Sequence, residues 1–126
     1  MIGSTRNIRV YAATRPINMS KGIDGLALIV RAELGRDPMS GDLFLFVGRD
    51  RRRAKVLYFD GTGMCVFYKR LDKGRFASVW HDDKERQIEL TATELTLFIE
   101  GSSLVGRYPV SPPAINEKEL VIGIRV

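Results

Sequence analysis

The sequence predicts an α+β fold in a single domain, in which an antiparallel β-meander packs against two helices. Three apolar runs in the middle of the chain have the length and composition of strands, at residues 43–47, 55–59 and 64–70. Two flanking segments, residues 20–34 and 92–100, carry apolar side chains at helical spacing. The chain has 126 residues and 44% of them are hydrophobic, which suits one core.

The first expected strand covers residues 7–14. Ile8, Val10 and Ala12 alternate there with other side chains, which is the period-two pattern of a strand. Pro16 ends the segment, because proline has no N–H to donate to a neighbouring strand. We therefore expect a short strand ahead of the first helix.

The first expected helix covers residues 20–34. Asn18 or Ser20 can cap its first turn by accepting a hydrogen bond from a backbone N–H, and Gly35 can close it. Its apolar stripe is formed by Ile23, Leu26, Ala27, Val30 and Leu34. Such a stripe is more typical of a face that packs on the protein's own core than of a face that binds a partner.

The three central runs predict consecutive antiparallel strands. Residues 43–47 are apolar at every position, so both faces of this strand are expected to be covered. A basic loop at residues 48–53 leads to the second strand at residues 55–59. The glycine-containing turn at residues 60–63 then joins it to the third, at residues 64–70, as a β-hairpin.

A short strand and the second helix are expected after the meander. Residues 87–90 are predicted to form the strand. Thr91 and Glu94 have the spacing of a capping box, in which each side chain accepts a hydrogen bond from the backbone N–H of the other residue. The helix that this box starts is predicted over residues 92–100, and Gly101 ends it.

The C-terminal segment, residues 102–126, contains three prolines and is expected to be irregular. The apolar residues 120–124 near its end either form a final strand or contact a partner, and the sequence leaves both open. No internal repeat or low-complexity tract divides the chain, so we assign residues 1–126 to one domain.

Positive charge is concentrated in the centre of the chain. Residues 48–76 hold nine Lys or Arg against three acidic residues. The nine are Arg49, Arg51, Arg52, Arg53, Lys55, Lys69, Arg70, Lys73 and Arg75. In an antiparallel meander the loop after residues 43–47 and the exit of the strand at residues 64–70 lie at the same end of the sheet. The two halves of the cluster are therefore expected to form one basic patch.

Such a patch favours binding to a polyanion such as nucleic acid, because each neutralised phosphate releases condensed counterions. The arginines at 51–53 can each donate several hydrogen bonds to phosphate oxygens. Four aromatic side chains near them offer possible stacking faces, although most are expected in the core: Tyr58, Tyr68, Phe76 and Trp80. The alternative is a solvated, highly charged surface loop.

The sequence offers little for catalysis. His81, Asp82 and Asp83 are the only local cluster with metal-ligand chemistry, and their polar neighbours are more typical of an exposed loop. The glycines within residues 22–25 and 60–63 belong to neither a Walker motif nor a dinucleotide fingerprint. We therefore expect no enzymatic activity, no metal site and no cofactor.

Cysteine content and hydropathy indicate the compartment. Cys65 is the only cysteine, so it cannot form an internal disulfide, and between apolar neighbours it is expected to pack as a small hydrophobic residue. No run approaches the ~20 apolar residues that span a bilayer, and no signal peptide follows Met1. These features predict a soluble protein of the cytoplasm with no membrane partner.

Several short motifs occur in a characteristic order between residues 7 and 100. They are Met19-x-Lys21-Gly22-x-Asp24-Gly25-Leu26, Asp37-Pro38-x-Ser40-Gly41-x-Leu43-Phe44, Lys55-Val56-Leu57-Tyr58, Asp60-Gly61-x-Gly63 and Phe67-Tyr68-Lys69-Arg70-Leu71-x-x-Gly74-Arg75-Phe76. With these motifs the chain resembles the TnpB accessory proteins of the insertion sequence 66 family, which are distinct from the RNA-guided nuclease of the same name. The proline-rich end after Arg107 does not resemble the usual tail of that family.

The resemblance implies a protein encoded beside a separate DDE-type transposase and needed for efficient transposition. Together with the basic patch, it predicts an accessory protein of a bacterial insertion sequence that assists DNA transposition by binding DNA, without catalytic activity of its own. The alternative is a protein-interaction module that docks on the element's transposase or on another accessory protein. Sequence leaves open the oligomeric state and whether the target is duplex or single-stranded.

Overall fold

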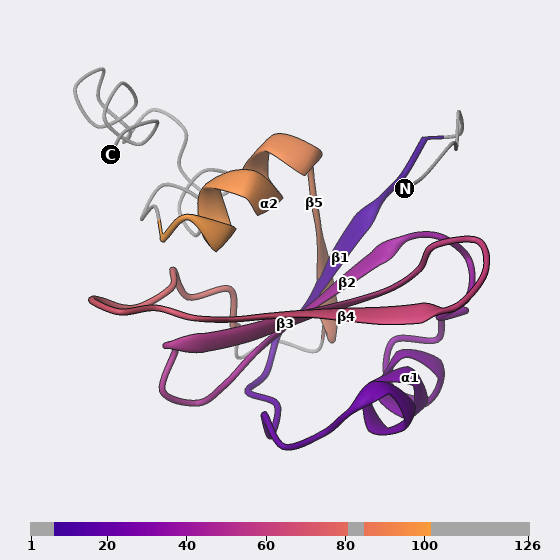
Figure 1. Cartoon of the computed structure of the whole chain (residues 1–126), viewed down its shortest axis with the longest axis horizontal. Helices are drawn as coiled ribbons and strands as arrows, with labels where there is room; N and C mark the ends of the chain where they lie inside the picture. Colours follow the sequence, from indigo (N-terminus) through magenta and orange to yellow (C-terminus); the bar gives the residue numbers. More distant parts are fainter. Residues whose placement is uncertain (1–6, 81–84, 102–126) are drawn as a thin grey trace.

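The computed structural model describes residues 7–80 and 85–101 and confirms the α+β class. One sheet of five strands, in the order β4-β3-β2-β1-β5, lies between two helices (Figure 1). In chain order the elements are β1 Val10–Ala13, α1 Ile23–Ala32, β2 Leu43–Val47, β3 Arg53–Phe59, β4 Met64–Arg70, β5 Gln87–Leu90 and α2 Ala92–Ile99. The bounds of β2, β4 and β5 match the sequence prediction.

The meander β2-β3-β4 is antiparallel, as predicted. The strand β1 is parallel to β2, with Tyr11 opposite Phe44, and antiparallel to β5, with Tyr11 opposite Glu89. The sheet is therefore mixed. The parallel pair follows from α1, because a helix between two strands carries the chain back to the starting end of the sheet.

The strand β1 is shorter than the predicted segment 7–14, and all four of its residues are buried. The period-two alternation was a weak guide here, because β1 has a strand on each side and a layer of side chains on each face. Its even residues, Val10 and Ala12, face the α2 side, whereas Tyr11 and Ala13 face the α1 side.

The helix α1 begins at Ile23, later than predicted, and the predicted cap is wrong. Gly22 is the N-cap residue and no side chain caps it. Asn18 instead accepts a hydrogen bond from the Ser20 N–H at its own Oδ1, at 2.8 Å, and so forms a local turn. The helix ends at Ala32, two residues short of the predicted end. Gly35 follows with φ +65°, and this left-handed residue closes the helix end, as predicted.

The strand β3 begins at Arg53, two residues earlier than predicted. The register of the hairpin places Arg53 opposite Arg70 and Phe59 opposite Met64. The basic loop between β2 and β3 is correspondingly shorter, and it spans residues 48–52. Arg53 therefore belongs to the sheet rather than to the loop.

The capping box of α2 is present as predicted. The Thr91 hydroxyl accepts a hydrogen bond from the Glu94 N–H at 3.0 Å, and the Glu94 carboxylate accepts one from the Thr91 N–H at 2.8 Å. The helix ends at Ile99, one residue short of the predicted end, and Gly101 follows with φ +85°.

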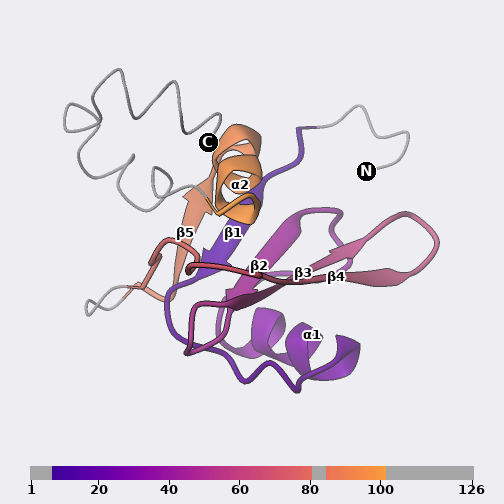
Figure 2. The same ribbon diagram turned by 60° about the vertical axis from the view of Figure 1, so that its left-hand side comes forward.

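The two helices cover opposite faces of the sheet (Figure 2). On the α1 side the core contains Leu26 and Val30 with Phe44 and Phe46. On the α2 side it contains Phe98 with Leu45, Val47, Val56 and Phe76. Phe76 and Phe98 stack at 4.9 Å between ring centroids, so the segment after β4 is fixed to α2.

Three sequence predictions lie outside the described residues: the strand or partner contact at 120–124, the irregular segment 102–126, and the placement of His81, Asp82 and Asp83. Within residues 7–80 and 85–101, no helix is long and apolar enough to cross a membrane. The same ranges contain no group of three His, Cys, Asp or Glu side chains placed to hold a metal ion.

Candidate nucleic-acid interface

Backbone hydrogen bonds join the two basic segments, as the meander predicts. The Leu71 N–H donates to the Arg52 carbonyl at 2.8 Å, and the Phe76 N–H donates to the Arg51 carbonyl at 2.6 Å. Figure 1 shows both segments at the same end of the sheet, opposite the β3–β4 turn. Residues 48–53 and 70–76 thus form one surface, which we call the basic end.

Five of the nine predicted basic side chains are exposed: Arg49, Arg52, Arg70, Lys73 and Arg75. A hollow of about 580 Å³ lies beside two of them, lined by Asp50, Arg52, Arg53, Arg70, Leu71 and Asp72. The Arg53–Arg70 pair places two guanidinium groups on adjacent strands. Like charges opposite each other destabilise a sheet, so this pair has an electrostatic cost that a bound anion would offset.

Arg51 and Arg53 have structural contacts. Arg51 is the non-glycine residue with positive φ in the described chain, at 58°, and its Nε donates to the Phe76 carbonyl at 3.0 Å. The Arg53 Nε lies 3.2 Å from the Asp50 carboxylate. The Arg52 N–H, and then the charge of Arg53, hold the pKa of Asp50 below its usual value. Asp50 therefore stays ionised and reduces the charge of the basic end.

Lys55 and Lys69 lie on opposite faces of the hairpin, so the nine residues do not form one uniform patch. The Lys55 Nζ donates to the Lys21 carbonyl at 2.9 Å and lies 5.5 Å from the centre of the Tyr68 ring. The Lys69 Nζ donates to the Ile99 carbonyl at 2.9 Å. This contact places a cation at the negative end of the α2 dipole.

The predicted stacking faces divide between core and surface. Phe76 is fully buried against Phe98 and offers no face to a base, in agreement with the expectation that most of these rings lie in the core. Trp80 packs on the same core. Tyr68 is about half exposed, beside Lys55. It is therefore the aromatic side chain of the four that is most open to a ligand.

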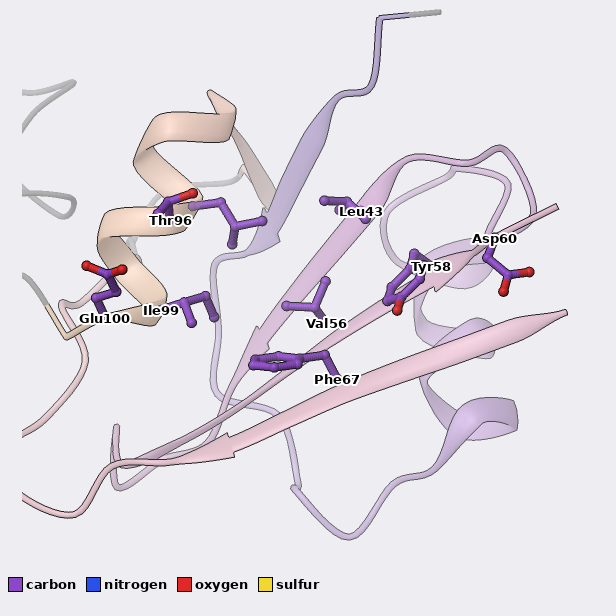
Figure 3. Close-up of a pocket in the computed structure, with 9 residues that line it drawn as sticks. Leu43, Val56, Tyr58, Asp60, Phe67, Thr96, Ile99 and Glu100 are labelled. Atoms are coloured by element: carbon purple, nitrogen blue, oxygen red, sulfur yellow. The ribbon is translucent and has the colours of Figure 1, made fainter. Parts of the chain in front are cut away.

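The structure adds an apolar groove that sequence reasoning missed. It lies between α2 and the sheet and has a volume of about 440 Å³. Leu43, Val56, Tyr58 and Phe67 line it from the strands, and Leu95 and Ile99 from α2 (Figure 3). The sequence signal for the groove was the apolar run in β4, which places apolar side chains on both faces of the strand. A strand with one covered face needs apolar residues on that face only. Phe67 is the one of these side chains that is exposed on the α2 side.

Cys65 lies opposite Tyr58, which lines the groove, on the adjacent strand. Partial burial raises the pKa of its thiol, and the nearby Asp60 carboxylate raises it further. A thiol with a raised pKa carries little thiolate at neutral pH and is a poor nucleophile. Its Sγ also donates to the Asp60 carboxylate at 3.5 Å, so the thiol has a polar partner.

The fold and the site define a class: a small α+β protein with a mixed sheet, one helix on each face, and positive charge gathered at one end of the sheet. Within this class the chain belongs to the family described as IS66 Orf2 like protein, whose model matches residues 8–107. Membership confirms the resemblance noted in the sequence, and it makes the protein an accessory protein associated with an insertion sequence.

Two curated relatives come from Sinorhizobium fredii (strain NBRC 101917 / NGR234). The chain is 40% identical to the uncharacterized protein y4hO over 101 residues, which are 80% of this chain and 86% of the relative. It is 33% identical to the uncharacterized protein y4jC over 115 residues, which are 90% of this chain and 97% of the relative. No solved structure matches the chain.

Proposed function

We propose that the protein binds DNA through its basic end and thereby assists transposition of its insertion sequence, while the element's separate transposase carries out cleavage and joining. One observation carries the proposal: hydrogen bonds between residues 51–52 and residues 71 and 76 bring together basic side chains that are far apart in the chain. Five of these side chains are exposed. Because the protein belongs to an insertion-sequence family, DNA is the polyanion that we expect it to bind.

The exposed side chains suit contacts with the phosphate backbone. Arginine donates to phosphate oxygens through a planar, fixed set of N–H groups, and such contacts position a protein without reading sequence. Arg52, Arg70 and Arg75 have exposed side chains for this role. Arg51 and Arg53 act less directly, because each donates to a group of its own chain.

The test is a DNA-binding titration across a salt series with Arg52→Ala/Arg75→Ala. We expect weaker binding to all duplexes and a flatter plot of log affinity against log salt, by up to about 0.9 for each phosphate that the variant no longer neutralises. Arg9→Ala/Arg31→Ala is the matched control, since it removes the same charge from two exposed positions outside the basic end. Equal weakening in the two variants would contradict the proposal.

The second candidate is docking of the basic end on an acidic surface of the transposase. It is favoured by the contacts that Arg51, Arg53, Lys55 and Lys69 make within the chain, which leave fewer donors for phosphates. Under this alternative, Arg52→Ala/Arg75→Ala leaves DNA affinity unchanged and lowers retention of the protein by immobilised transposase.

A further inference from the structure

The outer edge of β4 is the most open part of the sheet. Among the described residues β4 has a neighbour on one side only, and it is seven residues long. The opposite outer strand, β5, has four residues, and side-chain contacts from Arg36 and Arg9 reach its Gln87 and Glu89. Natural sheets keep outer strands short or charged, because unpaired backbone groups are a template for another strand.

The register identifies the backbone groups that face outward. At the two ends of the hairpin, the Asp60 N–H donates to the Gly63 carbonyl and the Leu71 N–H donates to the Arg52 carbonyl. Hydrogen-bonded and non-hydrogen-bonded pairs alternate along antiparallel strands, so the odd residues of β4 bond to β3. The N–H and C=O groups of Met64, Val66, Tyr68 and Arg70 therefore point away from the sheet.

The side chains at the centre of this edge are apolar and exposed. Phe67 is 45% exposed on the α2 side, and Tyr68 is 49% exposed on the α1 side. The charged side chains of β4, Lys69 and Arg70, both lie at its C-terminal end. Of these, Lys69 donates to the Ile99 carbonyl and is held against α2. The centre of β4 therefore carries apolar side chains and no charged ones.

We propose that β4 pairs with β4 of a second copy of this chain, antiparallel and about a twofold axis at Phe67. In this register Val66 exchanges both backbone hydrogen bonds with Tyr68 of the second copy, and Met64 does so with Arg70. Phe67 lies opposite its counterpart as a non-hydrogen-bonded pair, where side chains approach most closely. The two sheets become one continuous sheet of two copies.

The charged residues in and near β4 favour antiparallel over parallel pairing of the two copies. A parallel arrangement would place Lys69 and Arg70 of both copies side by side, and like charges directly opposite each other destabilise a sheet. The antiparallel arrangement brings Arg70 and Lys73 toward the turn of the second copy that carries Asp60. Backbone N–H groups of Thr62 and Gly63 hold the pKa of Asp60 below its usual value, so its carboxylate is ionised at neutral pH.

The dimer also covers the apolar groove on its Phe67 side. Phe67 lines the groove next to Val56 and Ile99 (Figure 3). Packing of the two Phe67 rings across the axis removes the exposed faces of both from water. Aromatic pairs across antiparallel strands are among the stabilising contacts of sheets.

The first measurement is the mass of the full chain in solution by light scattering, over a range of protein concentrations. We expect a dimer that dissociates when Phe67→Asp places two carboxylates opposite each other at the axis. Leu28→Asp is the matched control, since it changes a 60% exposed apolar residue on α1, and it leaves the dimer intact. A monomer at all concentrations, or a dimer insensitive to Phe67→Asp, overturns the proposal.

Cross-linking tests the register. With Cys65→Ser in the background, Phe67→Cys is expected to give a disulfide-linked dimer on mild oxidation, because facing Cα atoms in such a pair are about 4.5 Å apart. The native Cys65 is expected to give none, since four residues separate it from its counterpart along the strand, about 13 Å. Cross-linking at Cys65 but not at position 67 overturns the register. Both results are independent of DNA binding, so they stand or fall separately from the proposed function.

Discussion

Arg51 and Arg52 are neighbours in the sequence but have different roles in the structure. Arg52 is exposed and its carbonyl accepts a hydrogen bond from the segment after β4. Arg51 has a left-handed backbone, and both its carbonyl and its Nε bond to Phe76. The same residue type therefore offers a charge at one position and holds the loop at the next.

We expect Arg51→Ala to lower the free energy of unfolding by about 1 kcal/mol, because it removes the hydrogen bond to Phe76. Arg51→Gly removes the same bond but adopts positive φ without steric cost, so it should be more stable than Arg51→Ala by about 1 kcal/mol. Urea denaturation measures both. Equal stability of the two variants would show that the backbone at this position carries no strain.

At the level of elements, α2 shows how local chemistry positions a site. The helix has eight residues and would be marginal alone. Its capping box satisfies backbone donors at the start, and Lys69 donates to the Ile99 carbonyl at its end. These contacts fix the helix that forms one wall of the groove and packs Phe98 on Phe76.

Thr91→Ala is expected to destabilise the protein by about 1 kcal/mol, since the Glu94 N–H is left without its acceptor at the first turn of α2. Thr91→Ser keeps the hydroxyl and should retain most of the stability. Thr93→Ala, at an exposed position in the same turn, serves as the control and should change stability by less than about 0.5 kcal/mol. Thermal denaturation compares the three. Destabilisation at Thr93 equal to that at Thr91 would refute the role of the cap.

At the level of the whole molecule, the sheet has a core on each face, and the basic end depends on one of them. Phe76 is fully buried and stacks on Phe98 of α2. The backbone of Phe76 also bonds to both the carbonyl and the side chain of Arg51. Folding of the α2 side and assembly of the basic end are therefore coupled through a single residue.

Phe76→Ala is expected to lower the free energy of unfolding by about 3–5 kcal/mol, because it leaves a cavity beside Phe98 and removes a fully buried ring. Chemical denaturation provides the measurement. Leu28→Ala, at an exposed apolar position on α1, is the control and should cost less than about 0.5 kcal/mol. If Phe76→Ala costs no more than the control, the Phe76 ring does not stabilise the core on the α2 side.

The sequence by itself determined the features that depend on neighbouring residues. Period, turn residues and capping residues are local, so they predicted the meander, the bounds of β2, β4 and β5, and the capping box at Thr91. Antiparallel connectivity then placed the two basic segments at one end of the sheet, which the hydrogen bond from Leu71 to Arg52 confirms.

Tertiary structure decided what depends on distant partners. The parallel pairing of β1 with β2, and the burial of every residue of β1, follow from the strands and helices around it. Distant partners also decided where charged and aromatic side chains lie. Lys69 donates to the last turn of α2, and Phe76 is buried in the core rather than exposed at the surface. Local patterns show that a residue is charged or aromatic, but the groups it meets are set by chain segments that lie far away in sequence.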